Sequence, residues 1–168
     1  EHSRGALWSD VIPDCPIGPL PYARTGPGAA RDGLPRFDLT RFHQEYFDRL
    51  RLRVAAAGEA GVYVAVMLFQ GFSVEHYGDR NPFPFHPMHR DNNINEVDGD
   101  PGRAGDGRRC HTLDLPRVTA IQEAYVRKVI ETVGDLPNVL YEVSNESGAH
   151  STEWQYHIIR RVKEMEAS

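Results

Sequence analysis

The stretch NVLYEVSNESG, residues 138–148, combines a strand-like run with a polar end. Apolar and β-branched residues dominate 139–143, and the polar residues Ser144, Asn145 and Glu146 come next. The Ser-Gly pair that follows is typical of a turn. The pattern therefore predicts a buried strand that carries an amide and a carboxylate side by side at its carboxyl end.

A second strand is predicted over VYVAVMLFQ, residues 62–70, because this run is almost continuously apolar and rich in β-branched residues. Such runs are typical of strands that are covered on both faces, as in parallel sheets. Helical patterns, with apolar residues three and four positions apart, and long loops rich in glycine and proline separate the strands. The predicted order is a loop at 1–37, a helix at 38–60, a strand at 62–70, a loop at 71–113, a helix at 114–134, a strand at 138–146 and a helix at 151–166.

The alternation of strands and helices indicates an α/β fold with parallel strands. The loops expected after strands are long, whereas the loops expected after helices, at 55–61 and 134–137, are short. In a (β/α)8 barrel the loops after strands build the active site, and an open doubly wound sheet binds ligands at the same strand ends. We expect a partial (β/α)8 TIM barrel, with 1–168 belonging to a single catalytic domain.

Composition narrows the classes of partner. The chain has 168 residues, a formal net charge of −5 and a pI near 5.9, which argues against a nucleic-acid surface because such surfaces are basic. No run reaches the roughly 18 apolar residues of a membrane span. The chain starts without methionine, so we expect a cut or processed amino terminus. Cys15 and Cys110 form no zinc motif and are either a disulfide of an exported protein or two ordinary thiols.

The polar end of the later strand is the candidate site. A partly desolvated carboxyl at Glu146 can act as a general acid. The Asn145 amide beside it can donate hydrogen bonds to a substrate hydroxyl, and in glycoside hydrolysis such bonds to the sugar strengthen in the transition state. The alternative interpretation is an ordinary turn, in which asparagine is favoured and Glu146 is a surface residue.

Other polar residues are predicted to border this site. Glu142 and Ser144 point to the same side as Glu146, because alternate residues of a strand share a face. Glu142 is then either a structural buried carboxylate or a substrate contact. Gln70 and Glu75 follow the earlier strand and would flank the same cleft.

Aromatic residues near the strand ends have two interpretations each. Phe72 either stacks on a sugar face or packs in the core. Trp154 is either a sugar platform or a helix-packing residue. His150 either adjusts the protonation of Glu146 or lies on the surface as an ordinary histidine.

The loop at 71–113 offers a metal-binding alternative, since a His-x-x-His pair with a carboxylate can bind a metal. Neighbouring prolines disfavour the helix that this spacing suits, and the aspartates of the loop do not meet the EF-hand pattern. We therefore assign no metal site and expect a solvated loop that borders the cleft. The candidate ligands are His86, His89, Asp91 and His111, followed by Asp98, Asp100 and Asp106.

NVLYEVSNE, residues 138–146, resembles the fourth strand of cellulase-like TIM-barrel glycoside hydrolases, the clan A retaining enzymes, in which an Asn-Glu pair at the strand end carries the acid/base. The segment from LPYARTG to FSVE, residues 20–75, is similar to the second loop, second helix and third strand of bacterial members. EHSRG, residues 1–5, resembles the tail of their second strand. The resemblance covers nearly the whole chain, from the end of strand two to helix four.

The resemblance implies a fragment of a retaining O-glycoside hydrolase that acts on poly- or oligosaccharides, with Glu146 as acid/base and Asn145 as its substrate-orienting neighbour. It implies no cofactor and an extracellular or periplasmic location. The nucleophile of these enzymes is a glutamate at the end of the seventh strand, and nothing in 1–168 matches it. Because a retaining mechanism needs two carboxylates roughly 5–5.5 Å apart, we expect the chain by itself to be inactive.

Two other functions stay open at this point. The chain is alternatively a non-catalytic remnant of a glycan-binding barrel that holds sugars through Phe72 and Trp154 without cleaving them. Less favoured is an α/β enzyme whose loop histidines bind a metal.

Overall fold

The structure is a computed structural model that describes residues 19–75 and 81–167. The predictions for residues 1–18, including a pairing of Cys15, lie outside the described residues. Within the described ranges the chain forms four strands, three α-helices and four short 3-10 turns. None of the helices found there is long and apolar enough to cross a membrane.

The first two strands form an antiparallel hairpin, β1 (Tyr22–Ala29) with β2 (Pro35–Phe42). The prediction of an unbroken loop over 1–37 is therefore wrong for this segment. β1 tolerates its central Gly-Pro-Gly because the pairing register shifts between Arg24 and Ala29, where ladder bonds are not required. Gly26 and Gly28 have φ angles of 44° and 79°, which the absence of a Cβ permits.

The amphipathic helix predicted at 38–60 is present as α1 (Gln44–Glu59), but it begins six residues later than expected. Asp38, the first residue of the predicted helix, lies in β2 instead. Its carboxylate accepts hydrogen bonds from the backbone N–H and the hydroxyl of Thr40, at 3.0 and 2.6 Å. Phe37 and Leu39 of β2 are buried, a spacing of two that belongs to a strand.

The two predicted strands are confirmed as β3 (Val64–Gln70) and β4 (Val139–Asn145), and they pair in parallel. Their register places Gln70 opposite Asn145 at the carboxyl ends. The helices expected after them are α2 (Pro116–Val133) and α3 (Thr152–Glu166). Short 3-10 turns follow the strands and punctuate the long loop: η1 (Gly71–Ser73), η2 (Phe83–Phe85), η3 (Arg108–His111) and η4 (Ala149–Ser151).

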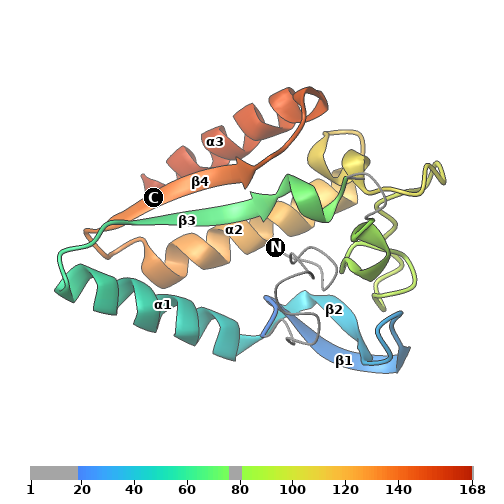
Figure 1. Cartoon of the computed structure of the whole chain (residues 1–168), viewed down its shortest axis with the longest axis horizontal. Coiled ribbons are helices and arrows are strands. Elements are labelled where there is room, and N and C mark those ends of the chain that lie inside the picture. The colour runs from blue at the N-terminus through green and yellow to red at the C-terminus, as the bar shows by residue number, and fades with distance from the viewer. Residues whose placement is uncertain (1–18, 76–80, 168) are drawn as a thin grey trace.

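The arrangement of these elements is not that of a TIM barrel. The three helices lie side by side, and the β3–β4 pair runs along them, whereas the β1–β2 hairpin is a separate two-stranded sheet (Figure 1). The predicted partial barrel is therefore wrong, and the described residues form a small α/β fold with two small sheets. The core lies between the parallel pair and the helices, and its fully buried side chains include Leu68, Phe69, Tyr125, Val129, Trp154 and Ile158.

The long loop between β3 and α2 folds against the hairpin. Phe37 of β2 donates its N–H to the carbonyl of Asn92 at 2.8 Å, and its carbonyl accepts the N–H of Ile94 at 2.9 Å. Both the loop and the hairpin lie toward the end of the molecule at which β3 and β4 finish (Figure 1). The strand ends are therefore surrounded by irregular but hydrogen-bonded segments.

Candidate functional site

The carboxyl ends of β3 and β4 bring two amide side chains together. The Nδ2 of Asn145 donates a hydrogen bond to the Oε1 of Gln70 at 3.2 Å. The same oxygen accepts the backbone N–H of Phe72 at 3.2 Å. Because Gln70 is held by its own turn, the Asn145 amide has a fixed orientation at the strand end.

Glu146 follows directly and has an unusual backbone. Its side chain is exposed and its φ is 50°, in the left-handed region that non-glycine residues rarely adopt. Gly71 of η1 packs against it so closely that a Cβ at Gly71 would lie 2.3 Å from the Glu146 carbonyl oxygen. The contact between the two loops therefore helps to hold Glu146 in a conformation that costs about 1–2 kcal/mol.

A second carboxylate, Glu75, lies at the same end of the sheet. Its Oε1 accepts the backbone N–H of Gly148 at 3.1 Å and is 3.6 Å from Nε2 of His150. The Glu75 side chain is 14% exposed. It joins the segment after β3 to the segment after β4. The residues that it contacts there, Gly148 and His150, follow Glu146 in the sequence.

His111 of η3 reaches the same loop from the long connection. Its ring stacks on Trp154 at a centroid distance of 4.2 Å, and its Nδ1 is 3.4 Å from the hydroxyl of Ser147. That hydroxyl is in turn 2.5 Å from the hydroxyl of Ser144. Burial, with a smaller effect of the nearby His150, lowers the pKa of His111 to about 3, so its ring is neutral at pH 7.

The remaining predicted side chains are placed as follows. Trp154 is 0% exposed and its Nε1 donates to Gln122 at 2.9 Å, so it packs in the core and presents no face to a sugar. Phe72 is half-buried beside the site. Glu142 is half-buried in the middle of β4, opposite Met67. His150 is an exposed residue that pairs with Glu75, as described above.

Apart from His111, the candidate metal ligands of the long loop are bonded within the loop or, for Asp91, to Arg31 of the hairpin turn. The Nδ1 atoms of His86 and His89 accept the backbone N–H groups of Met88 and Asp91, at 3.1 and 3.2 Å. Asp98, Asp100 and Asp106 likewise accept backbone N–H groups of their own turns. Over 19–75 and 81–167, no three histidine, cysteine or acidic side chains gather as a metal site would require. Cys110 is buried, and its Sγ lies 3.8 Å from the carbonyl oxygen of Gly99.

Two contacts at the strand ends, those of Ser147 and His111, are not predicted by the sequence. The sequence predicts Ser147 only as a turn residue, although a serine three positions after Ser144 can share a hydrogen bond with it across a tight turn. His111 was considered only as a metal ligand. Its stacking on Trp154 depends on how η3 docks on α3, which no local pattern shows.

Comparison with known proteins yields a family. The model of the family described as a domain of unknown function (DUF6298) matches residues 9–167. No curated protein and no solved structure matches the chain.

Proposed function

Because the chain belongs to the DUF6298 family of domains of unknown function, we propose its function from the strand-end site: it supplies the acid/base half of an O-glycoside hydrolase that acts on poly- or oligosaccharides. Glu146 is the proton donor to the departing sugar oxygen and later the base toward water. Asn145 orients a hydroxyl of the substrate.

The observation that carries the proposal is the conformation of Glu146. Uncommon backbone conformations in non-glycine residues persist where the surroundings enforce them, and they cluster at functional sites. Here the enforced residue is an exposed carboxylate at the carboxyl end of a parallel strand, where α/β proteins bind their ligands. Two exposed residues of the long loop, Glu96 and Arg103, also have a positive φ, so the feature that distinguishes Glu146 is its place directly after a parallel strand.

The neighbouring amide supports the same chemistry. Asn145 donates one N–H to Gln70, which fixes the plane of its amide. An amide carries a second N–H and an acceptor oxygen, and a sugar hydroxyl can both donate to and accept from such a group. Hydrogen bonds of this kind to the sugar strengthen as positive charge develops on the ring.

The second carboxylate of a retaining reaction is not assigned to this chain. Glu75 is already engaged by Gly148 and His150, and its role in the proposal is to position the loop that carries Glu146. The burial of Trp154 removes one of the two aromatic residues on which a purely sugar-binding function was based. Hydrolysis is therefore the function that the strand-end geometry favours.

The test is hydrolysis of a polysaccharide panel by the natural full-length protein and by its Glu146→Gln variant. Loss of general acid catalysis should lower kcat by about 10²–10⁴-fold, the usual contribution of such a group. Glu153→Gln, which changes an exposed carboxylate in the first turn of α3, is the matched control and should keep full activity. Equal activities of the Glu146→Gln variant and the control would refute the proposal.

A further inference from the structure

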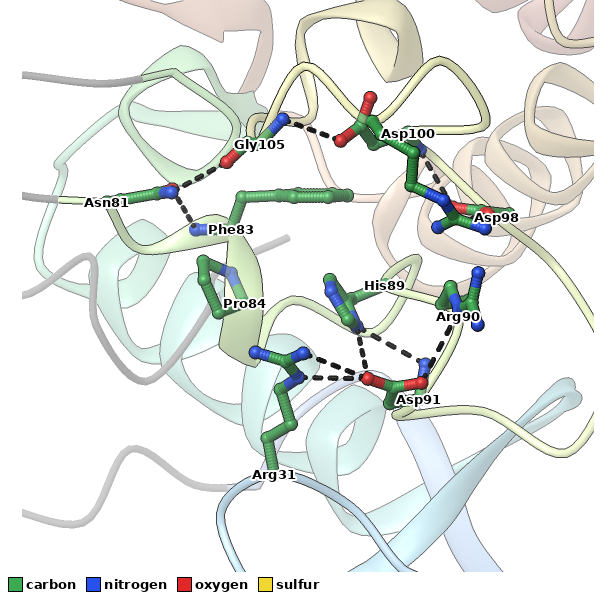
Figure 2. Close-up of a pocket in the computed structure, with 11 residues that line it drawn as sticks. Arg31, Asn81, Phe83, Pro84, His89, Arg90, Asp91, Asp98, Asp100 and Gly105 are labelled. Atoms are coloured by element: carbon green, nitrogen blue, oxygen red, sulfur yellow. Dashed lines mark hydrogen bonds and ion pairs between the residues drawn. The ribbon is translucent and has the colours of Figure 1, made fainter.

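A cavity of about 520 Å³ lies between the hairpin turn and the long loop, on a different set of residues from the strand-end site. Figure 2 shows Arg31 entering from the hairpin and facing Asp91, with His89 and Arg90 beside it and Asn81, Phe83 and Gly105 across the cavity. Its volume falls within the range of small-molecule sites. We call it the Arg31–Asp91 pocket. Its charged lining residues are Arg31, Arg90, Arg103, Asp91, Asp98 and Asp100.

The three arginines of this pocket each lie against an aspartate, and two of them share the same one. The Nε and Nη2 atoms of Arg31 lie 3.1 and 3.0 Å from one carboxylate oxygen of Asp91. Arg90 lies 3.5 Å from the other oxygen of Asp91. Arg103 lies 3.2 Å from Asp98. Each guanidinium is therefore oriented by an aspartate and retains further N–H donors, since an arginine carries five.

The formal charge of the lining balances. Three arginines face three aspartates, the third being Asp100. Burial, with a smaller effect of Arg31, lowers the pKa of His89, so this ring adds no charge at neutral pH. A balanced lining gives an anion or a cation no net attraction, whereas it suits a ligand that is uncharged and rich in hydrogen-bonding groups.

The frame of the pocket is held by hydrogen bonds and close packing. Asp100 accepts the N–H groups of Ala104 and Gly105 at 2.9 and 2.7 Å, and Asn81 donates to the Gly105 carbonyl at 2.6 Å. A Cβ on Gly107 would lie 2.2 Å from the ring of Phe83, so loop and ring are in direct contact. Such a preformed cavity lowers the ordering cost of binding.

We propose that the Arg31–Asp91 pocket is a second binding site, which takes a neutral saccharide unit. Adjacent hydroxyls of a sugar each donate and accept a hydrogen bond, and the Arg–Asp pairs offer donors and acceptors side by side at fixed positions. Pro84 and Phe83 supply the apolar part of the lining for the C–H groups of the ring. The choice of a saccharide as the ligand rests on the proposed function. The pocket and the arrangement of its charged residues are independent of that function.

The pocket is connected to the strand-end site through the backbone. Gly107 donates its N–H to the carbonyl of Val74 at 2.8 Å, and Val74 immediately precedes Glu75. The segment after Gly107 continues into η3, which carries His111 to Ser147. The loop that frames the pocket is therefore attached to the segments that follow both β3 and β4.

The test is calorimetric titration of the natural full-length protein, carrying Glu146→Gln to prevent turnover, with cellotetraose, xylotetraose and mannotetraose. At least one of these uncharged probes should bind. Arg31→Gln and Asp91→Asn should each weaken that binding by about tenfold or more, because each removes a charge-assisted hydrogen bond. Arg51→Gln, which breaks a comparably exposed Arg–Asp pair with Asp135 at the surface of α1, is the matched control and should bind as the parent does.

Three results would overturn the inference. The first is that none of the uncharged probes binds. The second is that a probe binds equally well to the Arg31→Gln, Asp91→Asn and control variants. The third is that inorganic phosphate or trigalacturonate binds through Arg31 while the uncharged probes do not. Circular dichroism spectra that match the parent will show that the two pocket variants are folded. Failure of the hydrolase proposal appears instead as unchanged turnover in Glu146→Gln, so the two failures are distinguishable.

Discussion

At the scale of single residues, the site depends on backbone contact as much as on side-chain chemistry. Glu146 adopts a left-handed conformation, and Gly71 of the neighbouring turn lies directly beneath its carbonyl group. Gly71 is required there because it has no Cβ, and not because of its own φ angle. The position of the candidate catalytic carboxylate is thus determined partly by a residue with no side chain.

Gly71→Ala should therefore destabilise the fold and disturb Glu146. The added methyl group would meet backbone atoms that cannot move aside easily, and overpacking of this kind typically costs about 1–3 kcal/mol. Gly102→Ala is the matched control, since its Cβ would have no neighbour closer than 4.0 Å. Urea denaturation of both variants measures the difference. A Gly71→Ala protein as stable as Gly102→Ala would show that the close contact is not maintained in solution.

At the scale of elements, the long loop is ordered by asparagine side chains. Asn93 is buried, and its Nδ2 lies 3.0–3.1 Å from the carbonyl oxygens of Pro87, His89 and Val97. Its Oδ1 accepts the N–H groups of Asn95 and Val97. One side chain therefore substitutes for the regular hydrogen bonds that this loop lacks, and it contacts the backbone of His89, which lines the Arg31–Asp91 pocket.

Asn93→Ala should lower the free energy of unfolding by about 1–3 kcal/mol or more, because buried carbonyl and N–H groups lose their partner. Hydrogen exchange should accelerate most at the amides of residues 86–98. Gln44→Ala, which removes an exposed amide bonded to Asp48 one helix turn away, should change stability by at most about 0.5 kcal/mol. Equal stability of the two variants would contradict the role of Asn93.

The helices and strands differ in how far the amino-acid sequence predicts them. β3, β4 and the three helices were predictable because their apolar periodicity is strong and local. The hairpin was not, because its Gly-Pro-Gly bulge has the composition of a loop and its strand character comes from pairing with β2. The Arg31–Asp91 pocket depends on a contact between two residues that are 60 positions apart in the sequence. Local sequence patterns therefore could not predict it either.

At the scale of the whole molecule, three helices support a parallel pair of strands at whose ends the proposed chemistry lies (Figure 1). The long loop is attached to the hairpin on one side and, through His111, to the strand-end site on the other. His111 and Trp154 stack where η3 meets α3, so the loop and the core share one buried contact.

This contact makes the stability of the fold depend on pH. The pKa of His111 is about 3 in the folded chain and about 6.5 in the unfolded chain, so between these values only the unfolded chain binds the proton. The free energy of unfolding should therefore fall as the pH is lowered from 6.5 toward 3, by up to about 1.4 kcal/mol per pH unit from this residue. Above about pH 7.5, where the unfolded chain has also lost this proton, the residue contributes almost no pH dependence.

His111→Phe keeps an aromatic ring against Trp154 but cannot titrate, and His111→Asn is a second non-titrating variant. Both should show a shallower loss of stability between pH 6.5 and 4.5 than the parent, whatever their stability at pH 7. Urea denaturation at several pH values measures these slopes. A slope unchanged in both variants would exclude a buried neutral histidine at this position.

The measurement that tests the central claim most directly compares two leaving groups in the natural full-length protein and its Glu146→Gln variant. If Glu146 is the general acid, the variant should lose about 10²–10⁴-fold on unactivated glycosides, which need a proton on the departing oxygen. It should retain far more of the glycosylation rate on dinitrophenyl glycosides, whose leaving group departs without that proton. An equal loss on both substrates would contradict the assignment of Glu146 as the acid/base.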